Sequence, residues 1–127
     1  MGMSDSWNEL VRIAEEEVAA TCAALPADLK PHLAAVPIRY QSYPDDALIE
    51  EGWDPDLLGL YTGDPVGVAD FEASPVPREI RLFLQNLWDY SDGEEEIYRE
   101  EIRITFLHEF GHYLGLDEDG MEERGLM

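Results

Sequence analysis

The sequence contains only one cysteine, Cys22, among its 127 residues. A single cysteine excludes an intrachain disulfide bond and a zinc site built from several thiolates. Cys22 falls among apolar residues that recur at helical spacing, so we expect its thiol to pack in the core rather than to act as a nucleophile. Any metal site in this chain must therefore draw on histidine, aspartate or glutamate side chains.

Basic residues are also scarce. The chain has 8 Lys and Arg against 29 Asp and Glu, which gives a formal net charge of −21 and a pI near 4.1. Such a surface repels nucleic acid phosphates and anionic membranes, so neither is an expected partner. It would attract divalent cations and basic peptides, although the same charge can serve solubility alone. The charge leaves the oligomeric state open.

Long hydrophobic runs are absent. No stretch approaches the roughly 20 apolar residues that span a bilayer, and the opening residues, MGMSDSWNEL, lack the basic and then apolar order of a secretory signal. We therefore expect a cytoplasmic protein. With 127 residues, 45% of them hydrophobic, the chain is long enough for one domain with its own core and too short for two. The prediction is a single domain over residues 1–127.

The pattern of apolar residues predicts a helix followed by short strands. Helical periodicity over residues 6–25 indicates an amphipathic helix. Short apolar runs predict strands at 36–43, 57–63, 66–71 and 78–84, the middle two forming a candidate hairpin. Because these strands lie between a first and a last helix, without strand–helix alternation, we expect an α+β fold in which a small mixed or antiparallel sheet packs against both helices.

The last long helix should carry the most informative segment of the chain. We expect it to begin near Ser91 or Asp92, because SDGEEE supplies a capping residue, a glutamate three positions later and acidic groups at the positive end of the helix dipole. It should end at Gly115, since glycine adopts the left-handed conformation that terminates many helices. The segment FLHEFGHYLGLDE, residues 106–118, would then form its last turns and its exit.

Two of the three histidines, His108 and His112, lie four residues apart in this segment. In a helix this spacing is about 400° of rotation and 6 Å of rise, so both imidazoles share one face and can bind one metal ion. Glu109 is rotated by about 100° from His108, which places its carboxylate beside the metal, where it can meet a bound water. Together these residues make HExxH, a motif typical of zinc proteases. The alternative is an ordinary amphipathic helix with two packing or surface histidines.

A four-coordinate catalytic zinc needs a third protein ligand and one open position for water. A continued helix would carry residue 118 about 9 Å beyond the second histidine, whereas a helix end at Gly115 lets the chain fold back and present an acid. The nearest candidates are Glu118 and its neighbour Asp117, and Glu122 and Glu123 are more remote ones.

The segment HEFGHYLGLDE resembles the zincin metallopeptidases, because it reads as HExxHxxGxxE. The spacing is similar to the metzincin pattern HExxHxxGxxH, with Glu118 in place of the third histidine. With the compact size and the strand LLGLYTG, it resembles the small bacterial zincin-like minimal metallopeptidases, whose third ligand is usually an acid at this spacing. It departs from metzincins in lacking an evident methionine turn, and packing is the favoured interpretation of Met121 and Met127.

The resemblance implies a zincin-like fold, a Zn²⁺ cofactor and peptide-bond hydrolysis. It implies three metal ligands: His108, His112 and Glu118, with Asp117 as the alternative third ligand. Zinc would lower the pKa of its bound water to about 7, and Glu109 would transfer the water proton to the leaving amine.

The expected substrate is a peptide or protein, basic if the charge selects it. It would run along the strand at 57–63 if that strand is a sheet edge rather than a core strand. The alternative function is a zinc-binding or partner-binding module with little or no hydrolytic activity. The presence of Glu109 favours the enzyme, since a structural zinc site has no need of a general base.

Overall fold

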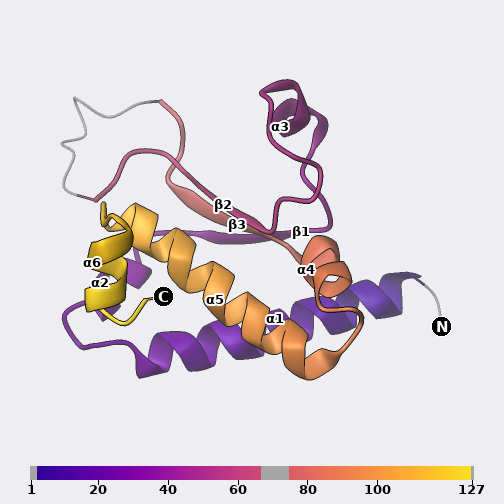
Figure 1. Ribbon diagram of the computed structural model, residues 1–127, viewed down its shortest axis with the longest axis horizontal. Helices are drawn as coiled ribbons and strands as arrows, with labels where there is room; N and C mark the ends of the chain where they lie inside the picture. The colour runs from indigo at the N-terminus through magenta and orange to yellow at the C-terminus, as the bar shows by residue number, and fades with distance from the viewer. Residues whose placement is uncertain (1–2, 67–74, 127) are drawn as a thin grey trace.

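The computed structural model describes residues 3–66 and 75–126. Its elements, in chain order, are α1 (Met3–Ala24), α2 (Lys30–Leu33), β1 (Ile38–Gln41), α3 (Asp46–Glu50), β2 (Gly59–Thr62), β3 (Glu79–Phe83), α4 (Leu84–Tyr90), α5 (Glu95–Tyr113) and α6 (Glu118–Glu123). Figure 1 shows the long helices α1 and α5 on one side of the sheet and α3 on the other. No helix in these described ranges combines the length and apolarity needed to cross a membrane.

The sheet has three strands in the order β1-β3-β2. The central strand β3 runs parallel to β1 and antiparallel to β2, so that Ile80 lies opposite both Ile38 and Tyr61. A small mixed sheet covered by long helices confirms the predicted α+β class. Within the sheet that the described residues form, β2 is an edge strand, and this edge lies next to α5.

The core lies between the sheet and the two long helices. Its buried residues include Ile80 and Leu82 of β3, Leu10, Ile13, Ala14 and Val18 of α1, and Tyr98, Ile102, Phe106 and Phe110 of α5. Cys22 packs against this cluster, as expected for a core thiol. On the opposite face of the sheet, a second small cluster joins Leu48 of α3 to Leu60 and Phe83. The sheet is therefore anchored on both faces, which fixes β2 relative to α5.

Three of the four predicted strands are present, each shorter than the apolar run that indicated it. The run at 78–84 ends as a strand at Phe83, because Leu84 already begins α4, a helix that the sequence reading did not anticipate. Leu84 and Leu87 are both fully buried, so their side chains continue the apolar run after the backbone has become helical. The predicted strand at 66–71 lies outside the described residues except for Val66, and so does the candidate hairpin.

The predicted start of the last long helix is wrong. Ser91 is instead the C-cap of α4, and its hydroxyl donates to the carbonyl of Leu87 at 2.7 Å. Asp92 and Gly93 then take positive φ values of 54° and 72°, which turns the chain between two helices. The helix α5 begins only at Glu95, where acidic residues in the first turn still suit the positive end of the dipole.

Candidate metal centre

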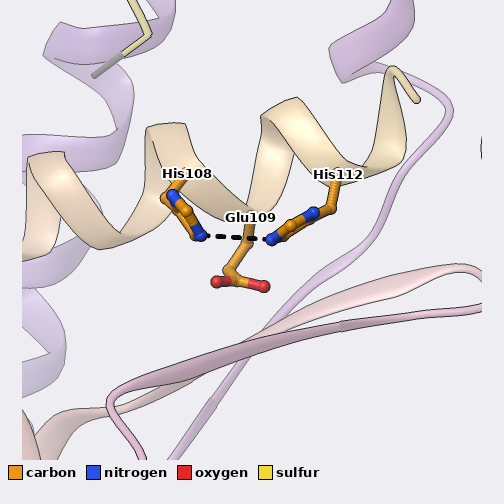
Figure 2. A group of neighbouring side chains, drawn as sticks. All are labelled: His108, Glu109 and His112. Atoms are coloured by element: carbon orange, nitrogen blue, oxygen red, sulfur yellow. Dashed lines mark hydrogen bonds between the residues drawn. The ribbon is translucent and has the colours of Figure 1, made fainter. Parts of the chain in front are cut away.

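The two histidines meet on one face of α5. The Nε2 atoms of His108 and His112 lie 3.1 Å apart, at hydrogen-bond distance, and the rings are nearly perpendicular at 88°. Figure 2 shows both imidazoles reaching toward each other from successive turns, with Glu109 between them and pointing toward the strands. The four-residue spacing predicts this arrangement, because it returns the side chains to the same side of a helix.

The donor set fits a zinc ion. Two imidazole nitrogens at about 2.0–2.1 Å from a tetrahedral zinc lie about 3.3 Å from each other, close to the 3.1 Å between the two Nε2 atoms. One ligand atom from each of His108, Glu109 and His112 falls within 4.8 Å of the others. Two imidazoles are donors that zinc accepts in proteins, and the Glu109 carboxylate lies beside them.

Glu109 is the most enclosed member of the group, with 9% of its surface exposed. Its Oε1 atom accepts a hydrogen bond from the main-chain N–H of Tyr61 at 2.8 Å. Burial raises the pKa of the Glu109 carboxyl, whereas the nearby His112, the Tyr61 N–H and His108 act in the opposite direction. The carboxyl group therefore sits in an environment suited to exchanging a proton rather than to remaining a fixed charge.

Tyr61 joins this centre through its main chain, a role that sequence reasoning did not assign to it. Its N–H reaches Glu109 across 48 positions of sequence, and its ring lies 5.6 Å from that of Tyr113. The Tyr61 hydroxyl donates to the carbonyl of Asp64 at 2.7 Å, and burial raises its pKa to about 12. A main-chain N–H is present whatever the side chain is, so residue type does not reveal this contact. The only signal in the sequence was the predicted strand at 57–63 as a possible sheet edge.

The helix ends as predicted, just after the second histidine. Gly115 has a φ of 76°, and its N–H donates to the carbonyl of His112, while Leu116 N–H donates to that of Gly111. These two bonds form a Schellman motif, which satisfies the last carbonyls of α5 and reverses the chain. The reversal returns α6 onto α5, where Met121 is fully buried beside Gly111.

Met121 packs in the core, as the packing interpretation predicts, and Met127 lies outside the described residues. A Cβ built on Gly111 would lie 2.7 Å from the Met121 sulfur, so the side chain of α6 rests directly on the backbone of α5. The turn of helix between the two histidines is therefore supported from behind by an apolar side chain.

The acidic candidates for a third ligand lie at the start of α6. Asp117 is its N-cap and accepts a hydrogen bond from the N–H of Gly120 at 2.7 Å. Glu118 is the first residue of the helix and is exposed, as are Glu122 and Glu123. Among the described residues, none of these carboxylates joins the group of ligand atoms that the histidines form. The third ligand therefore stays a prediction.

A comparison with protein families places this geometry in context. The sequence profile of the zincin-like metallopeptidases matches residues 33–126, about three-quarters of the chain. No curated protein matches the chain. The matched region contains the whole sheet, α5 with its HExxH segment and α6. The chain belongs to the zincin-like metallopeptidase family.

Proposed function

We propose that this protein is a zinc-dependent peptidase. The observation that carries the proposal is the convergence of the His108 and His112 Nε2 atoms beside the buried carboxylate of Glu109. A purely structural zinc site uses four protein ligands and needs no buried acid next to them. A general base beside two imidazoles instead suits a site that keeps one metal position for water.

The residues have distinct roles in this proposal. His108 and His112 would hold the zinc ion through Nε2. When bound, zinc lowers the pKa of water to about 7 and polarises the carbonyl of the peptide bond. Glu109 takes a proton from the attacking water as the new C–O bond forms, and then passes it to the amine nitrogen as the peptide C–N bond breaks. Its burial keeps competing water away from that carboxylate.

We propose Glu118 as the third ligand, with Asp117 as the alternative. Asp117 already uses one carboxylate oxygen to cap α6, and this bond would compete with metal binding. The Glu118 carboxylate makes no hydrogen bond or ion pair with the described part of the chain, and its longer side chain has more reach. Its position also completes the HExxHxxGxxE spacing.

A second candidate is a zinc-binding or partner-binding module with little or no hydrolytic activity. One observation favours it: in the described residues, no acid stands with the two histidines and Glu109 as a third ligand. The two candidates differ in a single measurable property, because only the peptidase turns over a peptide substrate.

The substrate in our proposal is a peptide or protein segment, with basic residues favoured by the net charge of −21. The edge strand β2 offers a place for an extended chain to lie. The cytoplasmic location stays a prediction, for which cell fractionation is the measurement.

The test is hydrolysis of a peptide library by the zinc-loaded protein, followed by mass spectrometry of the products. We expect cleavage that a chelator abolishes and added zinc restores. The matched variant is Glu109→Gln, which should retain zinc and lose the reaction by at least 100-fold, since general base catalysis contributes roughly 10²–10⁴-fold. Zinc-loaded protein that cleaves no peptide would instead support the binding module, and equal activity in Glu109→Gln would remove the role of Glu109.

A further inference from the structure

The N–H of Tyr61 faces away from its own sheet. Leu58 accepts a hydrogen bond from Phe83 N–H at 3.0 Å, so the main-chain groups of residue 58 point inward to β3. Because the direction alternates along an antiparallel strand, the groups of residues 59 and 61 point to the open edge. The bond from Tyr61 N–H to Glu109 rather than to β3 agrees with this alternation.

Contacts on both sides of this hydrogen bond hold the strand against the helix. Thr105, Glu109 and Tyr113 follow one another at four-residue spacing and share the face of α5 that meets β2. A Cβ built on Gly59 would lie 2.5 Å from the Thr105 methyl group, so strand and helix touch closely there. At the other end, the rings of Tyr61 and Tyr113 are 5.6 Å apart. The N–H is thus held in a fixed direction toward the carboxylate.

We propose that the main-chain N–H of Tyr61 is a positioning group for Glu109, which deepens the proposed peptidase function and rests on it. The N–H holds Oε1, which leaves Oε2 as the oxygen that exchanges the proton. The side chain is 9% exposed, so few other orientations are open to it. Without the N–H, the carboxylate would lose the hydrogen bond that fixes its direction.

The assignment also constrains substrate binding. A peptide that extends the sheet would normally accept from the outward N–H groups of the edge strand. The Tyr61 N–H is already donated to Glu109, so a peptide paired with Tyr61 would bind that residue only by donating its own N–H to the outward Tyr61 carbonyl. The substrate carbonyl at that register would then receive no hydrogen bond from Tyr61.

A matched pair of variants tests the positioning role. Tyr61→Ala removes the ring and keeps the N–H, whereas Tyr61→Pro removes both; proline is tolerated on edge strands where its missing N–H faces outward. Relative to Tyr61→Ala, we expect Tyr61→Pro to lower kcat about 10- to 100-fold, the range for one hydrogen bond to a charged group. KM should change by less than about threefold, and zinc content should be equal. Equal kcat values in the two variants would overturn the proposal.

A second measurement needs no activity and covers the case in which Tyr61→Pro fails to fold. Amide hydrogen exchange of the full chain should show protection of the Tyr61 N–H that is lost in Glu109→Ala. The Phe83 N–H, which donates to Leu58, is the reference for intact pairing of β2 and β3. Protection of Phe83 together with an unprotected Tyr61 amide in the unaltered protein would contradict the proposal. A protein that cleaves nothing but shows Glu109-dependent protection would instead refute the peptidase function alone.

Discussion

The proposed chemistry depends most on the carboxyl group of Glu109. It is enclosed between α5 and β2, with two imidazoles on one side and one main-chain donor on the other. Burial raises its pKa, and these neighbours limit the rise. A raised pKa makes this carboxylate a stronger proton acceptor than an exposed glutamate, which suits a general base.

The raised pKa of Glu109 means that its ionised carboxylate lowers the free energy of unfolding, and Glu109→Gln should remove this effect. A carboxyl whose pKa is higher in the folded state stabilises the fold below its unfolded pKa and loses this contribution as the pH rises through the folded value. The metal-free wild type should therefore lose stability relative to Glu109→Gln as the pH rises above the ordinary range of a glutamate carboxyl. Urea unfolding over a series of pH values measures the difference, and parallel curves for the two proteins would contradict it.

Single substitutions distinguish the two candidates for the third ligand, Glu118 and Asp117. Glu118→Gln should weaken zinc binding by more than about 100-fold, because even a supporting outer-shell partner is worth roughly 10- to 100-fold. Asp117→Asn should change it little, since asparagine still caps α6. Competition with a chromogenic chelator gives both affinities. If Asp117→Asn shows the larger loss, the two residues exchange roles.

At the scale of the elements, the centre depends on the contact between α5 and β2. Gly59 and Thr105 set the distance between them, because a Cβ on residue 59 would lie 2.5 Å from the Thr105 methyl group and 3.3 Å from the Arg81 carbonyl. Thr105 is one turn before Glu109, so the same contact determines how far Tyr61 N–H lies from the carboxylate. Small side chains at this crossing are therefore part of the site.

Gly59→Ala should overpack this crossing. We expect a loss of about 1–3 kcal/mol in the free energy of unfolding, the usual range for an extra methyl group in a filled core. Thr105→Ala opens the space that the new methyl group needs, so the double variant should recover part of the loss. Chemical unfolding of the two single variants and the double variant measures the coupling. Additive losses would show that the two positions do not touch.

The helix ends show what sequence can predict about elements. The end of α5 followed from Gly115, because glycine is the residue type that most readily takes a positive φ, here 76°. The start did not follow, because SDGEEE contains the signals of a helix start and also those of a turn between two helices. Ser91 ends α4 instead of starting α5. This outcome depends on the packing of Leu84 and Leu87, about which the local sequence pattern carries no information.

The candidate site also has one part that the sequence predicts and another that it does not. The meeting of His108, Glu109 and His112 could be predicted, since it needs only a helix and a spacing of four. The contact with Tyr61 could not, because it joins positions 48 apart through a main-chain group. The placement of Asp117 as an N-cap depends on the turn that follows Gly115. Long-range pairing and turn geometry therefore set the part that sequence alone leaves open.

At the scale of the whole molecule, the dominant property is its charge of −21. Many of the 8 basic side chains also form ion pairs within the chain. Ion pairs with carboxylates occupy Arg12, Arg39, Arg81, Arg99 and Arg124. Arg99 alone joins α5 to two glutamates of α1, Glu16 and Glu17. A field of one sign then surrounds the molecule, which favours approach by positively charged partners.

This negative field should make the protein cleave basic peptides in preference to acidic ones. At low ionic strength, peptides flanked by Lys or Arg should be cleaved with kcat/KM at least about tenfold above that for acidic peptides of the same length. The gap should narrow as salt rises, because the Debye length falls to about 3 Å at 1 M. Peptide kinetics over a salt series measure both effects. Equal rates on basic and acidic peptides would remove the role of the charge.

The central claim is that the two histidines of α5 hold zinc for hydrolysis. Its most direct test is metal content by mass spectrometry of the purified, zinc-replete protein beside a folded His108→Ala control, with peptide hydrolysis assayed on the same samples. The account predicts one zinc per chain, loss of that zinc in the control, and hydrolysis that disappears with it. No bound metal under zinc-replete conditions would contradict the account and leave His108 and His112 as two ordinary residues of a packed helix.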